Sequence, residues 1–282
     1  MKYINLVFLL SFSCSKGLGQ FALVDPSVRS NAVLAQFTNS SGSGFYIRDS
    51  TDVYFATARH VVLNPNTNIP YGDSLTLISY REDVENDDKI VLKVSIKSAL
   101  SSGNLKFDPA TDILIIKIAT LHFINSSGFA SVNYMPFCFR SGTSSRINSW
   151  SIENILKFES IEAGREIYII GYPQSLGLQG KFDLDRPLYR RGIIAGKDKK
   201  FHRIIGDAAV YFGNSGGMVL ELYYDKNGAP SMQLIGLVSE YIPFNDRLFD
   251  LQGNLRNVDL KNSGYSVIVP ADEIIDMVKS FK

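Results

Sequence analysis

The chain has 282 residues, of which 45% are hydrophobic and 20% are charged, and this is enough apolar material to bury a large core. Its 29 Lys and Arg residues nearly balance its 28 Asp and Glu residues, so it lacks the positive excess that nucleic acid or an anionic membrane would favour. The composition therefore predicts a globular protein of one large or two small domains and no nucleic-acid partner.

Residues 1–19 are typical of a secretion signal. Lys2 supplies a positive start, and the apolar run over residues 4–12 is too short to span a bilayer. The small residue Gly19 predicts cleavage directly after it, and hence export to the periplasm or the medium. Processing as a lipoprotein anchored through Cys14 is the alternative. No integral membrane segment is expected in the mature chain.

The cysteine and histidine content argues against a disulfide and a metal site. Removal of the signal would leave Cys138 as the one cysteine, so no intrachain disulfide is expected, and its neighbours Pro136, Phe137 and Phe139 predict burial. The Cys and His residues have no metal-ligand spacing, so neither a metal nor another cofactor is expected.

Short runs rich in β-branched and aromatic residues follow one another from residue 31, with turn residues between them. In the first part of the chain they predict strands at 32–37, 45–48, 53–57, 75–80, 90–96 and 112–118. Residues 58–62 are expected to end the third strand in a short helical turn. Residues 20–124 are therefore interpreted as an N-terminal β-domain.

Residues 125–150 are rich in Ser, Asn and Gly and are interpreted as a connector. Residues 151–270 are interpreted as a second β-domain, and residues 271–282 have the spacing of a helix with acidic residues in its first turn. Strands are predicted at 165–171, 191–196, 208–211, 218–223, 233–238 and 265–269. The predicted class is all-β, as two packed barrels or sandwiches closed by one helix.

The segment 207–217 ends in Gly-Asn-Ser-Gly-Gly, an unusual sequence for a turn. Three glycines within five residues favour a tight turn whose N–H groups point into a cleft. If Ser215 is a nucleophile, the N–H groups of Gly213 and Ser215 converge as an oxyanion hole. A glycine-rich turn that carries an incidental serine is the alternative.

A serine hydroxyl becomes a good nucleophile only beside a base, and that base needs a group to orient it. His122 lies in an apolar run and His202 in a basic loop, whereas His60 follows a predicted strand through small residues. Asp112 opens a run of four aliphatic residues, where a buried carboxylate needs a partner such as an imidazole N–H. His60 is thus the candidate base and Asp112 the candidate orienting acid for Ser215.

The order His60, Asp112, Ser215 and several short blocks resemble the trypsin-like serine peptidases, and most of all the protease domain of the bacterial HtrA/Deg group. Met218 departs from the family, which usually has proline at that position. Arg59, directly before His60, is a second departure. The blocks keep their order over roughly residues 30–280 and lie at 42–45, 57–62, 112–116, 170–173, 192–194, 207–217 and 234–238.

The resemblance implies that residues 20–282 form one peptidase unit of two six-stranded antiparallel β-barrels, with His60, Asp112 and Ser215 in the cleft between them. It implies an exported serine endopeptidase that acts on peptide or protein substrates through an acyl-enzyme, and no PDZ domain is expected after the helix. A catalytically silent peptide-binding protein and an esterase-type hydrolase are the alternatives. The sequence indicates no oligomeric state.

The resemblance also implies where the specificity pocket lies. Ala209 stands where a trypsin-type pocket has its acid, so a preference for Lys or Arg is not expected, and Asp207 is expected to support the loop. The strand over 236–239 is expected to pair with substrate by β-addition. The pocket is predicted to accept small or medium apolar side chains and to consist of Ala208, Ala209, Val210, Gly236, Leu237, Val238, Tyr265 and Ser266.

Overall fold

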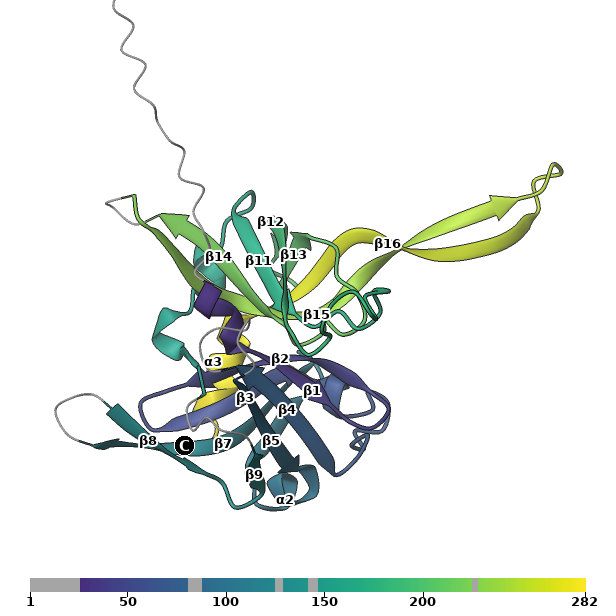
Figure 1. Cartoon of the computed structure of the whole chain (residues 1–282). Coiled ribbons are helices and arrows are strands. Elements are labelled where there is room, and N and C mark those ends of the chain that lie inside the picture. Colours follow the sequence, from purple (N-terminus) through teal and green to yellow (C-terminus); the bar gives the residue numbers. More distant parts are fainter. Residues whose placement is uncertain (1–25, 81–87, 125–128, 142–146, 225–227) are drawn as a thin grey trace, which may run out of the picture.

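A computed structural model of the chain describes residues 26–80, 88–124, 129–141, 147–224 and 228–282. Strands dominate these residues and form two sheets with a C-terminal helix (Figure 1), which confirms the predicted all-β class. The predicted signal and Cys14 lie outside the described residues. Within the described ranges, no helix has both the length and the apolar character that a membrane crossing requires.

The first half of the chain forms a curled ten-stranded sheet with the order β6-β7-β3-β2-β1-β4-β5-β9, while β8 pairs with β7 and β10 with β2. Short helices η1 (Pro26–Asn31), α1 (Arg59–Val62) and α2 (Ile96–Ser101) accompany it. The strands are β1 (Ala32–Gln36), β2 (Ser41–Arg48), β3 (Asp52–Ala58), β4 (Ser74–Tyr80), β5 (Lys89–Ser95), β6 (Leu105–Asp108), β7 (Ile113–Ile124), β8 (Phe129–Tyr134), β9 (Cys138–Ser141) and β10 (Trp150–Ser151).

The segment 125–150, interpreted above as a connector, contributes strands to this sheet. Its described residues include all of β8 and β9, which pair with β7 and β5, and the start of β10, which pairs with β2. These strands are short and lie at the margins of the sheet, among residues rich in Ser and Asn. A sequence rich in Ser and Asn therefore concealed them, and the first sheet has more strands than the six expected.

The second half forms a closed six-stranded barrel with the order β11-β12-β13-β16-β15-β14, as expected. Two short 3₁₀ helices, η2 (Ile152–Asn154) and η3 (Phe158–Ser160), precede it. The predicted strand over 208–211 is wrong: the strand ends at Asp207, and the next residues leave the sheet as a loop that includes Ser215. The strands are β11 (Glu166–Gly171), β12 (Leu188–Asp198), β13 (Arg203–Asp207), β14 (Met218–Tyr224), β15 (Pro230–Phe249) and β16 (Leu255–Pro270).

Strands β15 and β16 continue well beyond the barrel. The predicted strands at 233–238 and 265–269 are only the parts that lie in the barrel wall. Farther out, the pairing extends from Pro243↔Asn262 to Phe249↔Leu255, and Figure 1 shows this hairpin projecting away from the rest of the molecule. Polar and apolar residues alternate in this hairpin, and several of the polar residues are charged. No strand was predicted there from the sequence.

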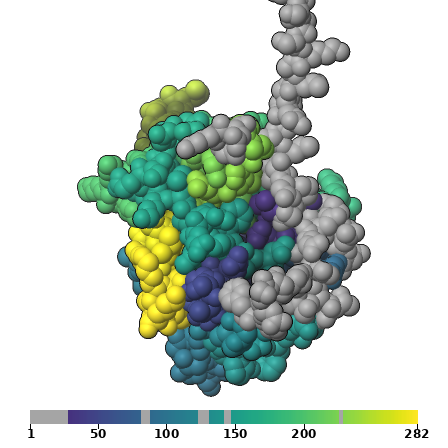
Figure 2. All heavy atoms as spheres, turned by 90° about the vertical axis from the view of Figure 1, so that its left-hand side faces the viewer, coloured from purple at the N-terminus to yellow at the C-terminus, as the bar shows by residue number. Residues whose placement is uncertain are grey.

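The C-terminal helix α3 (Ala271–Lys279) confirms the predicted helix. Its apolar face, which includes Ile274 and Val278, is buried in the larger of two hydrophobic cores. The Asp272 carboxylate accepts a hydrogen bond of 2.8 Å from the N–H of Phe158. Because α3 contacts both β7 and β15, it joins the two halves, and Figure 2 shows this C-terminal segment along one flank of the molecule.

The larger core also continues across the junction between the halves. It is built mainly from β1 to β7, and it includes Ile170, Tyr172, Met218 and Leu237 of the second half. Burial of these side chains stabilises the contact between the sheets by roughly 1.5–3 kcal/mol for each large apolar side chain. The continuous core therefore fixes how the loops of one half face the loops of the other.

Candidate active site

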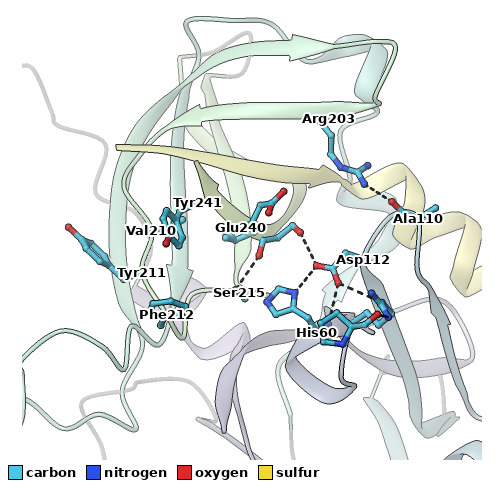
Figure 3. Close-up of a pocket in the computed structure, with 14 residues that line it drawn as sticks. His60, Ala110, Asp112, Arg203, Val210, Tyr211, Phe212, Ser215, Glu240 and Tyr241 are labelled. Carbon is cyan, nitrogen blue, oxygen red and sulfur yellow. Dashed lines mark hydrogen bonds and ion pairs between the residues drawn. The ribbon is translucent and has the colours of Figure 1, made fainter. Parts of the chain in front are cut away.

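A cleft of about 500 Å³ lies between the two halves (Figure 3). The three residues singled out in the sequence, His60, Asp112 and Ser215, all line it. Its other lining residues are Arg59, Pro65 and Ala110 from the first half and Arg203, Val210, Tyr211, Phe212, Val238, Ser239, Glu240 and Tyr241 from the second.

His60 and Asp112 form a hydrogen-bonded pair at the floor of this cleft. The Nδ1 atom of His60, which lies in α1, is 2.7 Å from Oδ2 of Asp112, and the His60 backbone N–H donates to Oδ1 at 3.2 Å. An ionised carboxylate only accepts hydrogen bonds, so Nδ1 carries the proton. The neutral imidazole therefore keeps Nε2 as an acceptor for a third group.

The backbone at Asp112 turns its carboxylate toward α1. Asp112 has a φ of +62°, in the left-handed region that Asp tolerates better than most residues. Its N–H donates to the Asp108 carbonyl at 3.0 Å, and its own carbonyl accepts from the Arg59 N–H at 2.7 Å. The turn between β6 and β7 is therefore held at both ends and presents Asp112 to His60.

Arg59 brings a buried positive charge to the same carboxylate. The residue is only 7% exposed, and its guanidinium donates to the Pro65 carbonyl and to the Asn68 side chain. Its Nε lies 3.9 Å from Oδ1 of Asp112. At this distance the two opposite charges attract, and water screens buried charges little. Arg59, which departs from the family pattern at the position before His60, thus helps to hold Asp112 in place.

Ser239 joins Asp112 to Ser215, a role that was not expected from the sequence. Its hydroxyl donates to Oδ2 of Asp112 at 2.8 Å, and its carbonyl accepts from the Ser215 hydroxyl at 3.1 Å. The Ser215 hydroxyl is thus directed to the Ser239 carbonyl, and Figure 3 draws no bond between Ser215 and His60. No sequence pattern pointed to Ser239, because its partner Asp112 is 127 residues away.

Two glycines allow the loop that contains Ser215 to pass between its neighbours. Gly213 has a φ of +98° and Gly216 a φ of +81°, a conformation that side chains disfavour. A Cβ atom at Gly213 would lie 2.2 Å from the Tyr172 carbonyl oxygen, and one at Gly216 would lie 2.1 Å from the Ser43 carbonyl oxygen. The glycines predicted to form a tight turn are therefore required by space as well as by conformation.

Ser43 of β2 clamps this loop from the first half of the chain. Its buried hydroxyl donates to the Gly213 carbonyl at 2.5 Å and accepts from the Tyr172 N–H at 2.8 Å. Its backbone N–H donates to the Ser215 carbonyl at 2.8 Å. This role of Ser43 was not expected from the block 42–45, although a small polar residue between two glycines was a signal available there.

The peptide before Gly213 is turned so that its N–H is available. The Phe212 carbonyl accepts from the backbone N–H and the hydroxyl of Ser175, both at 3.4 Å. In a trans peptide the carbonyl and the following N–H point in opposite directions, so the Gly213 N–H is directed away from Ser175. Among the residues that the structure describes, neither this N–H nor that of Ser215 has a protein acceptor.

Two of the eight predicted pocket residues, Val210 and Val238, line the cleft. Gly236 and Leu237 do not, because that part of β15 pairs with β14, through Val219↔Gly236 and Met218↔Leu237. The edge of β15 is therefore already occupied there, and the part of β15 that faces the cleft is 238–241 instead of the expected 236–239.

The other predicted pocket residues lie elsewhere in the second barrel. Ala208 is buried in its core, and Ser266 is buried with its hydroxyl 3.4 Å from the Gly206 carbonyl. Ala209 is half-buried and Tyr265 is exposed, and neither lines the cleft. The aromatic residues Tyr211, Phe212 and Tyr241, which the sequence analysis did not assign, take their place.

The remaining histidines and the cysteine lie outside the cleft. His122 is exposed on β7, and the Nδ1 atom of His202 is 2.6 Å from the Glu273 carboxylate. Burial raises the pKa of the Cys138 thiol to about 12, so it is a poor nucleophile. The described part of the chain has no group of three or more His, Cys, Asp and Glu side chains that could hold a metal ion.

A family model described as the trypsin-like peptidase domain matches residues 42–224. This is more than half of the chain, and the match includes His60, Asp112 and Ser215. The chain therefore belongs to the trypsin-like peptidase family, a family of serine proteases. A search of the curated proteins gives no significant match.

Three solved structures match most of this chain at low sequence identity. The serine endoprotease from Yersinia pestis is 16% identical over 89% of this chain and 62% of its own, with a TM-score of 0.47. The HtrA-type protease AlgW with tripeptide is 17% identical over 89% and 60%, with a TM-score of 0.46. Deg5 is 13% identical over 89% and 88%, with a TM-score of 0.47. The chain thus spans about three fifths of the length of the first two.

Proposed function

We propose that the chain is a serine endopeptidase that hydrolyses peptide bonds through an acyl-enzyme, with Ser215 as nucleophile, His60 as base and Asp112 as the residue that orients His60. One observation carries the proposal: the hydrogen-bonded pair of His60 and Asp112 lies in the same cleft as Ser215. The available N–H groups of Gly213 and Ser215 support it, because they suit a developing oxyanion.

The proposed reaction begins when the Ser215 hydroxyl rotates from the Ser239 carbonyl to Nε2 of His60. His60 takes the proton as Ser215 attacks the peptide carbonyl, and the N–H groups of Gly213 and Ser215 stabilise the oxyanion. His60 then gives the proton to the leaving amine. Water, deprotonated by His60, releases the acid from the acyl-enzyme. Throughout, Asp112 keeps the proton on Nδ1 and stabilises the imidazolium.

We propose cleavage after small or medium apolar side chains. Val210 is 2% exposed, and Tyr241 is half-buried against the second core. The Tyr241 ring also packs edge-on against Phe212, with the ring centroids 6.1 Å apart, so this wall of the cleft is apolar. Asp207 is exposed and does not line the cleft, so Asp207 itself gives no preference for Lys or Arg.

We further propose that the protein is exported, on the strength of the apolar start of the sequence. Mass spectrometry of the mature protein tests this: an N-terminus at Gln20 supports simple cleavage, and a lipid on Cys14 supports anchoring. The full-length chain recovered from the cytoplasm in a strain that exports other proteins normally would contradict export.

A fluorophosphonate probe tests the proposed chemistry most directly, because it labels only an activated serine. We expect labelling of the intact protein and none of Ser215→Ala or His60→Ala, while the matched control His122→Ala labels normally. Labelling of Ser215→Ala equal to that of the intact protein, or no labelling of the intact protein, would contradict the proposal.

The hydrogen bond between Ser215 and the Ser239 carbonyl favours one alternative, a protein that binds peptides without cleaving them. Digestion of casein separates the two, because only the peptidase releases fragments. Hydrolysis of small esters without digestion of casein would indicate the esterase instead.

A further inference from the structure

The outer parts of β15 and β16, residues 243–262, form a two-stranded hairpin that we call the ribbon. In the described chain, it pairs with no third strand, and it projects from the barrel (Figure 1). A two-stranded hairpin is at best marginally stable in water by itself. A partner that adds a strand would therefore stabilise the ribbon.

The ribbon exposes an unusual number of large apolar side chains. Each is between 41% and 102% exposed, far above what a buried face shows, and exposed apolar groups of this kind mark interaction sites. They are Phe244, Leu248, Phe249, Leu251, Leu255, Val258 and Leu260.

The charges on the ribbon cancel. Its three aspartates match its three basic residues, and two pairs form within the ribbon, Lys261 with Asp246 and Arg256 with Asp250. A surface without net charge has no electrostatic preference for nucleic acid or anionic lipid. The ribbon therefore fits an apolar polypeptide better than either of these.

The ribbon is continuous with the cleft. Residues 238–241 of β15 line the cleft and lead directly into Pro243. Because β14 stops pairing with β15 at Leu237, the edge of β15 is open from Ser239 outward. The Ser239 carbonyl already points out of the ladder, toward Ser215. One open strand edge thus runs from the candidate nucleophile along the ribbon.

Pairing of substrate with the cleft-lining residues 238–241 is what the family resemblance leads one to expect. We propose that the ribbon prolongs this pairing: the edge of β15 from Pro243 to Phe249 binds, as an added strand, residues of the polypeptide substrate that lie well before the cleaved bond. The inference rests on the proposed function. Every strand pairing in the second barrel is antiparallel, and an antiparallel strand on β15 begins near Phe249 and ends at Ser215. This path spans about ten residues, or roughly 34 Å.

The side chains along this edge indicate the class of substrate. Pro243 has no N–H and offers only its carbonyl, so recognition beyond it depends more on side chains. Phe244 and Leu248 lie on one face of β15, because alternate residues of a strand share a face. The ribbon therefore selects extended chains with apolar residues at alternate positions.

Two peptides with the same cleaved bond test the proposal. One has four residues before that bond, and the other has ten, with apolar residues at alternate positions. We expect the longer peptide to have a kcat/KM about tenfold higher, because two or three additional cross-strand pairs suffice for that factor. Equal values for the two peptides would overturn the proposal.

Matched variants locate the effect on the ribbon. Leu248→Ser should remove most of the preference for the longer peptide and leave cleavage of the shorter one unchanged. Leu260→Ser makes the same kind of change at an exposed residue of β16, away from the proposed edge, and should keep the preference. Equal losses in both variants would overturn the added strand on β15.

Binding to Ser215→Ala separates this inference from the proposed function. We expect a fluorescent ten-residue peptide to bind this variant, and to bind about tenfold more weakly when residues 244–261 are also replaced by two glycines. Unchanged binding would overturn the ribbon site. The ribbon site is also overturned if the same replacement abolishes a dimer in sedimentation, or binding to neutral lipid vesicles, while peptide binding stays unchanged. Binding without cleavage of any peptide by the intact protein would refute only the peptidase.

Discussion

The loop around Ser215 and the ribbon both leave the second barrel beside the same cleft, yet they are held in opposite ways. Asn214 in the loop is only 2% exposed, and Ser43 of the other half clamps the peptides around it. The ribbon has only its own two strands, and it exposes most of its apolar side chains to water. Hydrogen bonds are concentrated around Ser215, where the proposed reaction needs atoms in a fixed position. The ribbon keeps an unpaired edge, where a chain of variable sequence is proposed to bind.

The largest expected effect comes from the acid that orients His60. Asp112→Asn should lower kcat/KM by about 10⁴-fold, because an amide can donate to Nδ1 and so favour the wrong tautomer. Hydrolysis of the short peptide measures this, and thermal unfolding serves as the control. A loss below tenfold in a folded variant would contradict the role of Asp112.

Two glycines with the same φ of +81° compare the loop and the ribbon directly. At Gly216 a Cβ would collide with the Ser43 carbonyl, whereas at Gly253, in the ribbon turn, no atom lies within 4 Å. Gly216→Ala should lower the free energy of unfolding by roughly 2–4 kcal/mol and abolish labelling of Ser215. Gly253→Ala should cost about 1 kcal/mol, confined to the turn.

Chemical denaturation and probe labelling of both glycine variants check this difference. Similar losses in the two variants would show that the φ angle decides the cost and that the close approach of Ser43 does not.

Two serines that donate to backbone carbonyls provide the next comparison. Ser43→Ala leaves the buried Gly213 carbonyl and Tyr172 N–H without their partner, at a cost of about 1–3 kcal/mol. Ser263 donates to the Ile242 carbonyl at the base of the ribbon, where water is close enough to replace it, so Ser263→Ala should cost below about 1 kcal/mol. Denaturation midpoints measure both, and a larger loss for Ser263→Ala would contradict the contrast.

The smallest effects concern two aspartates as pH falls. Burial acts to raise the pKa of Asp49, but the N–H groups of Thr51 and Asp52 and the Lys282 ammonium outweigh it and lower the pKa. This carboxylate therefore contributes stability that is present above the ordinary pKa of about 4 and is lost as pH falls through the lowered value. Asp49→Asn should reduce the acid dependence of the unfolding free energy.

Asp250 at the ribbon turn is half-buried, and the N–H of Asn254 lowers its pKa. Its protonation should loosen only that turn as pH falls through the lowered pKa. NMR titration of both carboxylates checks these directions, and a global transition that follows Asp250 would contradict the separation of ribbon and barrel.

The sequence predicted most of the fold because most strands are runs of apolar residues that become buried. The runs that became β3, β4 and β14 were identified within one or two residues of each end, since their apolar side chains fill the cores. We selected His60, Asp112 and Ser215 as candidates because each stands beside such a run or in a glycine turn. Their residue types and order narrowed the choice to few candidates.

The supporting residues could not be predicted in the same way. Ser43 and Ser239 are ordinary serines in the sequence, and their roles arise from partners 170 and 127 residues away. The substrate edge was expected at 236–239, because nothing in the sequence shows that β14 occupies the edge of β15 up to Leu237. The strands β8 and β9 were missed because they are short and lie among residues rich in Ser and Asn. The ribbon was missed because its apolar side chains are exposed instead of filling a core.

The sequence by itself determined the all-β class, the C-terminal helix and the three candidate catalytic residues, because these follow from local residue types and their spacing. Only the tertiary structure decided that His60 and Asp112 bond to each other, that Ser43 clamps the loop of Ser215, and that β15 leaves the barrel with an open edge. The physical reason is that a hydrogen bond or an unpaired edge depends on which groups meet in space, and residues far apart in the chain supply those groups.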